Sequence, residues 1–295
     1  MTEPPKVLIV IVNWNGYRDT VELLHSLSLV TYKPYDILVI DNGSLADEAA
    51  MLKKNFPYIT TIRNKQNLGY AGGNNTAIPY AYKNGYDIIA ILNNDLTVEK
   101  GFLEPLVTAL QTKPEVGLTC AVVRNFQKKE FIQSAGGIIH VATGTVRLLH
   151  SIPKNSTVDF APGACFCIRT SLLSKLNGFD EHFFAYWEEC DLAMRARRLG
   201  FHARLATNST VFHKTASSSK YLSRTYVYFM LRNQLYFMRK HCPWFLRPLY
   251  LLFFFFRNVL GYFFVSVIRK SPGYRTIPRA IADGFTKSLS TSSDQ

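Results

Sequence analysis

Short apolar runs alternate with helix-like segments over the first 92 residues, and this alternation constrains the fold more than any other feature of the chain. Strand-length runs, apolar or β-branched, occur at Val7–Val12, Asp36–Ile40, Ile59–Ile62 and Ile88–Leu92. Runs of this kind are typical of parallel strands covered on both faces. Helical composition and spacing mark the segments between them, Asp19–Leu29, Asp47–Asn55 and Ala71–Lys83. The pattern predicts an α/β fold whose mostly parallel central sheet is flanked by helices.

Each of these four strands is followed by a polar loop. The loops read NWNG (13–16), DNGS (41–44), NLGYAGGNN (67–75) and NND (93–95). Ligands of such sheets bind beyond the carboxyl ends of the strands, where loops and helix N-termini present backbone N–H groups. We therefore expect the four loops to form one binding edge. Its candidate residues are Asn13, Asn15, Asp41, Asn67, Gly69, Gly72, Gly73, Asn74, Asn93, Asn94 and Asp95.

Local structural roles compete with binding in these loops. Asp41 also suits a turn or helix cap ahead of Gly43-Ser44. The glycines also suit a tight connection from strand to helix. Asp95 also suits the cap of a helix over Val98–Leu110. On the residues alone, both interpretations stay open.

The second half of the chain predicts further strands. Hairpin-like turns are expected at Gly136-Gly137 and Thr143-Gly144, within Val116–Ile168. A pair of strands, Ala203–Leu205 and Thr210–His213, is expected to end the compact domain. Between these parts, acidic residues precede a basic helical segment within Phe179–Phe201.

Charge and cysteine content exclude several classes of protein. The net charge is +13, and residues 201–295 contain 14 Lys and Arg against two Asp and Glu. These basic residues accompany a Phe-rich apolar run rather than a nucleic-acid-binding module, so we expect no nucleic acid partner. The five cysteines have no CxxC spacing and their number is odd, which disfavours a disulfide framework or zinc ribbon and favours a reducing compartment. The N-terminus lacks the features of a signal peptide, and we expect the catalytic part to stay in the cytosol.

Six motifs in a fixed order are specific enough to compare with a known family. They are VIVNWNG, VIDNGS, NLGYAGGNN, LNNDLTVEKGFL, PGACFCIRTSLLSKLNGFDEHFFAYWEECDLAMRARRLGF and VFHKTASSS, within residues 6–218 or so. In this order they resemble the family 2 inverting glycosyltransferases, which have the GT-A (nucleotide-diphospho-sugar transferase) fold, and especially their bacterial rhamnosyltransferase-like members. The resemblance implies a hexosyltransferase that moves a sugar from a nucleotide diphosphate to an acceptor hydroxyl group.

The resemblance also implies a metal site. GT-A enzymes usually carry a DxD-type motif whose carboxylate binds Mn²⁺ or Mg²⁺, and the ion bridges the two donor phosphates. Asn93-Asn94-Asp95 occupies this place, with Asn93 where a first aspartate often stands. A single carboxylate provides few ligands for a divalent ion, so a second protein ligand is expected. The family places a metal-binding histidine at the position of His213. Neutral imidazole suits Mn²⁺ better than Ca²⁺.

The motif WEECD (187–191) supplies the candidate catalytic acids Glu188, Glu189 and Asp191. The resemblance puts Glu189 at the position of the family's catalytic acid, which is Asp in many members. Glu188 and Asp191 are expected to support the helix start. The alternative is a set of acids that complement a helix dipole, together with an i,i+4 pair between Asp191 and Arg195.

Aromatic residues precede these acids. Sugar rings present apolar C–H faces that stack on aromatic side chains, and we expect Trp187 and Tyr186 to form a wall for the acceptor or donor sugar. Core packing is an equal alternative for Phe183 and Phe184.

The donor and acceptor follow from the resemblance alone. It implies dTDP-L-rhamnose as the donor and a saccharide or lipid-linked saccharide acceptor, in the synthesis of a cell-surface polysaccharide such as lipopolysaccharide O-antigen. A UDP-sugar such as UDP-glucose or UDP-galactose is the alternative donor. A dinucleotide-binding oxidoreductase is disfavoured because the glycine loop follows the third strand and does not read GxGxxG.

The composition predicts two regions, a catalytic domain over residues 1–218 and a basic, aromatic, helical region over 219–295. Within the second, Pro248–Ile268 is apolar for about one membrane span but contains Arg257, whose insertion costs roughly 2.5–3.5 kcal/mol. We expect a helix on an anionic membrane surface, which makes the protein peripheral at the inner face of a bacterial cell membrane. Spanning the bilayer, an oligomer interface and burial against the catalytic domain are the alternatives.

Overall fold

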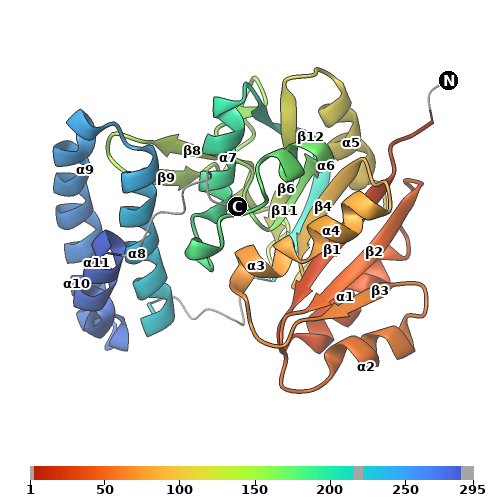
Figure 1. The fold of residues 1–295 in the computed structure, drawn as a ribbon, viewed down its shortest axis with the longest axis horizontal. Helices are drawn as coiled ribbons and strands as arrows, with labels where there is room; N and C mark the ends of the chain where they lie inside the picture. The colour runs from red at the N-terminus through yellow and green to blue at the C-terminus, as the bar shows by residue number, and fades with distance from the viewer. Residues whose placement is uncertain (1–2, 215–221, 287–295) are drawn as a thin grey trace.

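The computed structural model describes residues 3–214 and 222–286. A sheet of ten strands crosses the catalytic part, with the main strand order β10-β12-β6-β11-β4-β1-β2-β3. Helices cover both of its faces (Figure 1). The predicted α/β fold with a central sheet is therefore confirmed.

The N-terminal strands are parallel, as their continuous apolar composition predicts. β1 (Val7–Asn13) pairs in parallel with β2 (Tyr35–Asp41) and with β4 (Ile88–Asn93), and β2 pairs in parallel with β3 (Thr60–Arg63). The carboxyl ends of these strands consequently lie along one edge of the sheet.

The helices between these strands also occur where the sequence predicts them. They are α1 (Tyr17–Leu27), α2 (Glu48–Asn55), α3 (Gly69–Asn75) and α4 (Ala77–Lys83). The segment expected as one helix is divided at Thr76, because Pro79 has no N–H to donate to the carbonyl of Asn75.

Successive residues of β1 face two different cores. Val7, Ile9 and Ile11 pack with α1, α2 and α5 (Leu103–Gln111), whereas Leu8 and Val10 pack with α3 and α4 on the other face. A strand that is buried on both faces needs no polar alternation, which explains the unbroken VLIVIV run.

The rest of the sheet is mixed. Its strands are β5 (Leu96–Val98), β6 (Val116–Asn125), β7 (Ile132–Ser134), β10 (Thr157–Val158), β11 (Cys165–Arg169) and β12 (His202–His213). β11 runs antiparallel between β4 and β6, and β12 runs parallel to β6.

Two predictions for this half are wrong. The expected pair of strands at 203–205 and 210–213 is one strand, β12, because both segments continue along β6 with a register shift between Ala206 and Thr210. Gly136-Gly137 forms no hairpin turn, because β7 pairs with β6 while β8 (Gly137–His140) pairs with β9 (Thr145–Leu148). The turn at Thr143-Gly144 does join the β8–β9 hairpin, as predicted.

A second group of helices stands beside the sheet domain, next to α7 (Glu188–Arg198) and the β8–β9 hairpin (Figure 1). Its members are α8 (Arg224–His241), α9 (Arg247–Phe253), the π-helical Phe254–Val259, α10 (Leu260–Ile268) and α11 (Ile277–Thr286). They have a core of their own, and α8 also shares a core with α7. The expected boundary at 218 lies outside the described residues.

Candidate active site

Side-chain amides join the loops at the carboxyl edge of the sheet. Asn42, at the end of β2, is the central one: its Oδ1 accepts from Asn64 Nδ2 (3.0 Å) and from Leu68 N–H (3.2 Å). Its Nδ2 donates to Asn67 Oδ1 (3.1 Å) and to the carbonyl of Gly69 (2.9 Å). The loops after β2 and β3 are therefore fixed to each other.

Asn13 connects the loop after β1 to α2. This buried amide donates from Nδ2 to Glu48 Oε2 (2.7 Å) and accepts at Oδ1 from the hydroxyl of Thr20 (2.7 Å). Asn15 adds a second connection, because its Oδ1 accepts from Leu45 N–H (2.9 Å). In this structure both asparagines hold the loops together, and their contact with a nucleobase stays a prediction.

Asp41 has the turn geometry that was one of its two interpretations. Its fully buried carboxylate accepts from Ser44 N–H (3.0 Å) and Ala49 N–H (3.3 Å), and Arg63 lies 3.4 Å away. The cap of α2 is Asp47. A contact of Asp41 with the nucleoside stays a prediction.

The glycine loop opens α3 in close contact with a second loop. Gly69 has φ +73°, and a Cβ there would lie 2.3 Å from the carbonyl oxygen of Phe184, so only glycine fits. A Cβ on Gly72 or Gly73 would lie 2.8 or 2.9 Å from a neighbouring side chain. Asn67 Oδ1 accepts from Gly69 N–H (2.8 Å), and Asn74 Nδ2 donates to Tyr70 O (2.9 Å). These residues build the loop geometry.

The NND loop meets the end of β12. His213 Nε2 lies 3.1 Å from Asp95 Oδ1, and these two residues are 118 positions apart. Asn94 Nδ2 donates to Thr20 Oγ1 (3.2 Å) and lies within 3.4 Å of the carbonyl of Gly16. The partly buried Asn93 ends β4, and its N–H donates to Ala164 O (2.9 Å). Because β5 and not a helix follows Asp95, this residue caps no helix.

Gln133 sets the tautomer of His213. Its Nε2 donates to the backbone carbonyl of His213 (3.2 Å), so its Oε1 must face His213 Nδ1 at 3.0 Å. The Nδ1 atom therefore carries the proton, and in the neutral ring the Nε2 lone pair points at a carboxylate oxygen. Two acceptor atoms facing each other are a favourable arrangement for a cation.

The distance between His213 Nε2 and Asp95 Oδ1 suits two ligands of one divalent ion. Adjacent ligands of an octahedral ion with bonds of about 2.1 Å are about 3.0 Å apart, and His213 Nε2 and Asp95 Oδ1 are 3.1 Å apart. Across residues 3–214 and 222–286, no group of three or more His, Cys, Asp or Glu is arranged around a metal position. Metal binding by Asp95 and His213 therefore stays a prediction, and among the described residues it would rest on these two side chains.

Glu188 and Glu189 form an acidic pair at the start of α7, where Glu188 is buried and Glu189 is partly buried. Glu188 is 4% exposed, and within the described structure Oε2 of each residue is buried without a hydrogen-bond partner. Burial raises the pKa of Glu188 well above its ordinary value, and the neighbouring Glu189 raises it further. Burial also raises the pKa of Glu189, but backbone N–H groups and Glu188 oppose this rise. Glu188 consequently takes up a proton first, and Glu189 is the more readily ionised.

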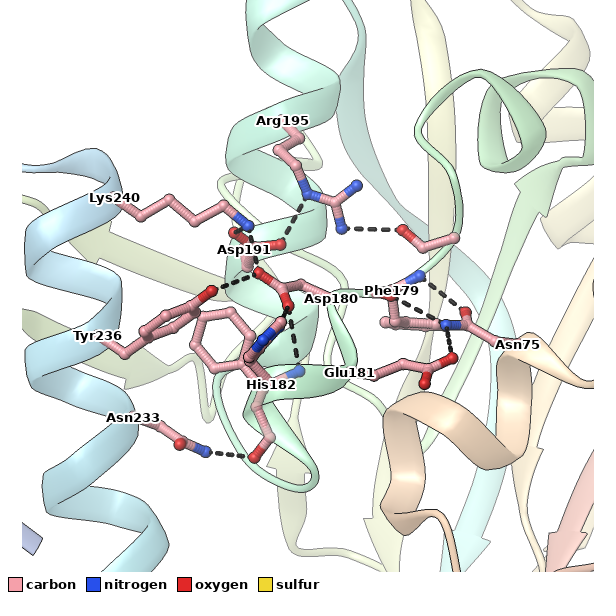
Figure 2. A network of polar contacts seen from close by, with 12 residues as sticks. Asn75, Phe179, Asp180, Glu181, His182, Asp191, Arg195, Asn233, Tyr236 and Lys240 are labelled. Carbon is pink, nitrogen blue, oxygen red and sulfur yellow. Dashed lines mark hydrogen bonds and ion pairs between the residues drawn. The ribbon is translucent and has the colours of Figure 1, made fainter. Parts of the chain in front are cut away.

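Asp191 is held by two cations, Arg195 and Lys240, and by the imidazole of His241. Its Oδ2 accepts from Arg195 Nε (2.7 Å), and its Oδ1 lies 2.7 Å from His241 Nε2 and 2.8 Å from Lys240 Nζ. Burial alone would raise the pKa of Asp191, but His241, Arg195 and Lys240 together hold it well below its usual range. Figure 2 shows Lys240 reaching from α8 to Asp191 and Asp180. Asp191 therefore joins α7 to α8, in line with the predicted supporting role and the predicted Arg195 pair.

The two aromatic residues before the acids differ in exposure. Trp187 is 7% exposed and packs on Phe237 of α8 with ring centroids 5.1 Å apart, so its ring belongs to the core and offers little surface to a sugar. Tyr186 is partly exposed, and its ring meets the edge of Tyr226. A sugar-binding role stays a prediction for Tyr186, whereas Trp187 has the packing role that was the alternative for Phe183 and Phe184.

Comparison with known proteins identifies the class of this site. Residues 8–176, more than half of the chain, match the model of glycosyl transferase family 2. The chain belongs to glycosyl transferase family 2. The predicted family, and with it a transferase enzyme, are therefore confirmed.

Named relatives of this glycosyltransferase include two rhamnosyltransferases. It is 23% identical over 235 residues to the N-acetylglucosaminyl-diphospho-decaprenol L-rhamnosyltransferase of Mycobacterium tuberculosis, covering 72% of this chain and 76% of that protein. It is 26% identical over 212 residues to the rhamnosyltransferase WbbL of Escherichia coli, covering 66% and 78%.

Solved glycosyltransferase structures share the fold. The mannosyltransferase of Pyrobaculum calidifontis, in complex with GDP-Man and Mn²⁺, superposes with a TM-score of 0.61 at 15% identity, covering 98% of this chain and 77% of that one. GalNAc-T7 with UDP, GalNAc and Mn²⁺ gives a TM-score of 0.62 at 14% identity, covering 96% and 57%. The glycosyltransferase described here thus has the GT-A fold.

Sequence reasoning missed several residues of the site. Asn42 and Tyr70 stand in the DNGS and NLGYAGGNN motifs without having been singled out, while Gln133 had no motif to mark it. Tyr70 donates its hydroxyl to Gly163 O (2.7 Å), beside the acidic pair. Burial, followed by Glu188 and Glu189, raises the pKa of Tyr70 well above its usual value, so this hydroxyl stays protonated.

Proposed function

We propose that this family 2 enzyme transfers a sugar, with inversion at the anomeric carbon, from a nucleotide diphosphate donor to a saccharide or lipid-linked saccharide acceptor, and that it depends on Mn²⁺ or Mg²⁺. The observation that carries the proposal is the convergence of Asp95 Oδ1 and His213 Nε2 at 3.1 Å. When bound there, the ion would neutralise the negative charge that develops on the departing nucleotide diphosphate.

The acidic pair supplies the second part of the reaction. The acceptor hydroxyl must lose a proton as it attacks, and a carboxylate within hydrogen-bonding reach can take it. Glu189 is our candidate base because it is the more readily ionised member of the pair. The N–H of Gly163 also stabilises its carboxylate, and Gly163 precedes Ala164, whose carbonyl binds the NND loop at Asn93. The base and the metal pair are thereby connected through one short segment.

L-Rhamnose from dTDP-L-rhamnose is the proposed donor sugar, supported by the two rhamnosyltransferase relatives. The printed name of the mycobacterial relative includes a diphospho-decaprenol acceptor, which favours a lipid-linked saccharide here. A UDP-sugar is the second candidate, favoured by the solved relative that holds UDP and Mn²⁺.

An anionic membrane surface is the proposed partner of the C-terminal helices, at the inner face of the bacterial cell membrane. Among the described residues, only Trp244–Ile268 is long and apolar enough to cross a bilayer. Its exposed side chains include Trp244, Phe245, Leu252, Phe255, Phe256, Phe264 and Ile268. Basic residues at the two ends, such as Arg247, Arg269 and Lys270, suit anionic headgroups.

Contacts with the rest of the protein favour a helix that lies on the membrane. Tyr250, Phe254 and Val259 are buried in the core that includes α8, so one face of the helix is already occupied. Arg257 Nη1 donates to Thr145 Oγ1 (2.7 Å), and Asn258 Nδ2 donates to Gln234 Oε1 (2.9 Å). The polar residues in the middle of the apolar run thus have protein partners, which leaves the opposite face to lipid.

The proposal is tested by screening donors for binding and then for transfer. The full-length protein is titrated with dTDP-rhamnose, UDP-glucose, UDP-galactose and GDP-mannose, each with and without Mn²⁺, and its melting temperature is followed. We expect a Mn²⁺-dependent rise with dTDP-rhamnose, and transfer of its sugar to a lipid-linked saccharide. The proposal fails if no nucleotide sugar raises the melting temperature more with Mn²⁺ than with EDTA.

A further inference from the structure

One amide on α8 binds three carbonyls of the loop before the catalytic acids. Asn233 is completely buried, and its Nδ2 lies 2.8 Å from the carbonyl oxygen of Phe183, 2.7 Å from that of Ala185 and 2.8 Å from that of Tyr186, so its two N–H groups are shared among three acceptors. Figure 2 shows Asn233 pointing from α8 toward this loop. A single side chain therefore fixes most of the backbone between η1 (Glu181–Phe183) and α7.

Arg232 fixes the orientation of that amide. Its Nε donates to Asn233 Oδ1 (2.7 Å), so Nδ2 must be the atom that faces the carbonyls. Its Nη2 donates to the carbonyls of His182 (2.6 Å) and Phe183 (2.8 Å), and the whole residue is only 5% exposed. Together the two adjacent side chains bind the carbonyls of four residues in a stretch of five.

The loop that they hold has an unfavourable backbone. Phe184, Tyr186 and Trp187 have φ values of +63°, +68° and +75°, and none of them is glycine. Side chains other than Gly, Asn and Asp rarely adopt this left-handed conformation, and it persists only where the surroundings impose it. Such strain is the expected consequence of turning the chain so that Glu188 and Glu189 begin α7 in their buried place.

The same loop touches the glycine loop of the donor edge. The N–H of Ala71 donates to the carbonyl of Phe184 (3.2 Å), and Gly69 is packed against that carbonyl. A displacement of residues 183–186 would therefore shift the acidic pair and its distance from the glycine loop at the same time.

We propose that Asn233, oriented by Arg232, is a positioning residue for the transfer reaction: it holds residues 183–186 in the strained conformation that places Glu188 and Glu189 against the donor edge. The inference rests on the proposed function for its catalytic consequence. It also gives the C-terminal helices a role in the chemistry, in addition to the proposed membrane contact.

Asn233→Asp is the sharpest test. It keeps the shape of the side chain and its contact with Arg232 Nε, but it replaces the Nδ2 amide group by an oxygen that faces three carbonyl oxygens. We expect kcat to fall by about 100-fold, as for a displacement of about 1 Å at a reacting group. The dissociation constant for the nucleotide with Mn²⁺ is expected to stay within about threefold of the wild-type value. Asp95 and His213 lie at β5 and β12, outside the loop of residues 183–186 that Asn233 holds.

Gln234→Ala is the matched control. Gln234 is the next residue of α8, it is also buried, and its Nε2 donates to the carbonyl of Gly144 (2.9 Å) in the β8–β9 hairpin rather than to the catalytic loop. This variant is expected to lose stability but to keep kcat. If Asn233→Asp does not fold, Arg232→Lys is measured instead, since it keeps the charge but cannot hold the amide and two carbonyls together.

Hydrogen exchange separates this inference from the proposed function. Amide protection in residues 183–191 is expected to fall in Asn233→Asp and to be unchanged in Gln234→Ala, whatever reaction the protein catalyses. Equal kcat in the two variants, or unchanged protection of residues 183–191 in Asn233→Asp, would overturn the positioning role. If Asn233→Asp loses this protection but the wild-type protein transfers no sugar, only the proposed function is rejected.

Discussion

The imidazole Nε2 of His213 and the carboxylate Oδ1 of Asp95 lie 3.1 Å apart at the edge of the sheet, across 118 positions of the chain. β5, which follows Asp95, pairs antiparallel with the end of β12, which includes His213. Strand pairing therefore brings the two residues together before any ligand is present. A preformed pair loses little conformational entropy when it binds an ion.

Removing the carboxylate should abolish metal dependence. In Asp95→Ala, His213 remains as the one protein ligand, and we expect Mn²⁺-dependent donor hydrolysis and sugar transfer to fall below detection. Electron paramagnetic resonance of Mn²⁺ measures binding directly in the presence of the nucleotide diphosphate. Activity that persists in Asp95→Ala and in EDTA alike would contradict the metal site.

Gln133 should tune the same site without touching the ion. Its loss in Gln133→Ala frees His213 to adopt the other tautomer, and the removal of such an outer partner typically weakens metal affinity by about 10–100-fold. Titration with Mn²⁺ in the presence of nucleotide measures the effect. Gln127→Ala, in the nearby loop, is a suitable control that should leave the affinity unchanged.

The acidic pair predicts the pH dependence of the rate. The base must be ionised, and burial raises the pKa of both Glu188 and Glu189, so kcat should begin to fall on acidification at a higher pH than the ordinary Glu value of about 4.3 allows. Glu189→Gln should lower kcat by about 10²–10⁴-fold. Glu188→Gln should be milder, since Glu188 is the first of the two to take up a proton. The reverse order of the two variants would exchange their roles.

Asp191 predicts how stability depends on pH. Its folded-state pKa lies well below the unfolded value, so its contribution is complete above about pH 5 and is lost as the pH falls toward the folded-state pKa. Asp191→Asn leaves Arg195 without its buried carboxylate and Lys240 with Asp180 alone, and should cost about 3–5 kcal/mol near pH 7. Urea unfolding at pH 7 and pH 4 measures this cost, and we expect a smaller difference from the wild type at pH 4.

Membrane binding should require the exposed aromatic side chains. Phe255→Glu combined with Phe264→Glu places two charges on the exposed face of the apolar helix, and we expect the protein to lose binding to phosphatidylglycerol vesicles in flotation. Tyr58→Glu combined with Tyr82→Glu adds the same charges at exposed aromatic positions of the sheet domain, and should retain binding. Equal flotation of both double variants would contradict the membrane surface.

The parallel half of the sheet could be predicted from sequence because the residues of each buried strand are consecutive and apolar. In β1 and β4 each residue faces one of two cores, so the strands are continuous apolar runs and the loops begin where the runs end. The resemblance, and not the pattern, paired Asp95 with His213, since no local signal relates residues so far apart. β12 was interpreted as two strands because its register shift contains the polar residues Thr207, Asn208 and Ser209.

The residues that hold the site together gave no comparable signal. Asn42, Gln133 and Asn233 act by donating to or accepting from groups that lie 22 to 80 positions away, and an isolated amide has no periodicity. Trp187 was assigned to the surface because aromatic residues beside acids suit a sugar site equally well. The burial of the Trp187 ring becomes visible only in the structure, where Phe237 of α8 packs against it.

The dependence of Asp191 on Lys240 and His241 also sets the order in which the chain can mature. A ribosome adds Asp191 to the chain 50 residues before His241, and until α8 is complete the carboxylate lacks two of its three partners, Lys240 and His241. The loop of residues 183–186 likewise cannot be held in place until Asn233 has been made. The active site is therefore completed only after the last turn of α8 has emerged, and the enzyme gains its activity only as the helices proposed to reach the membrane are being made.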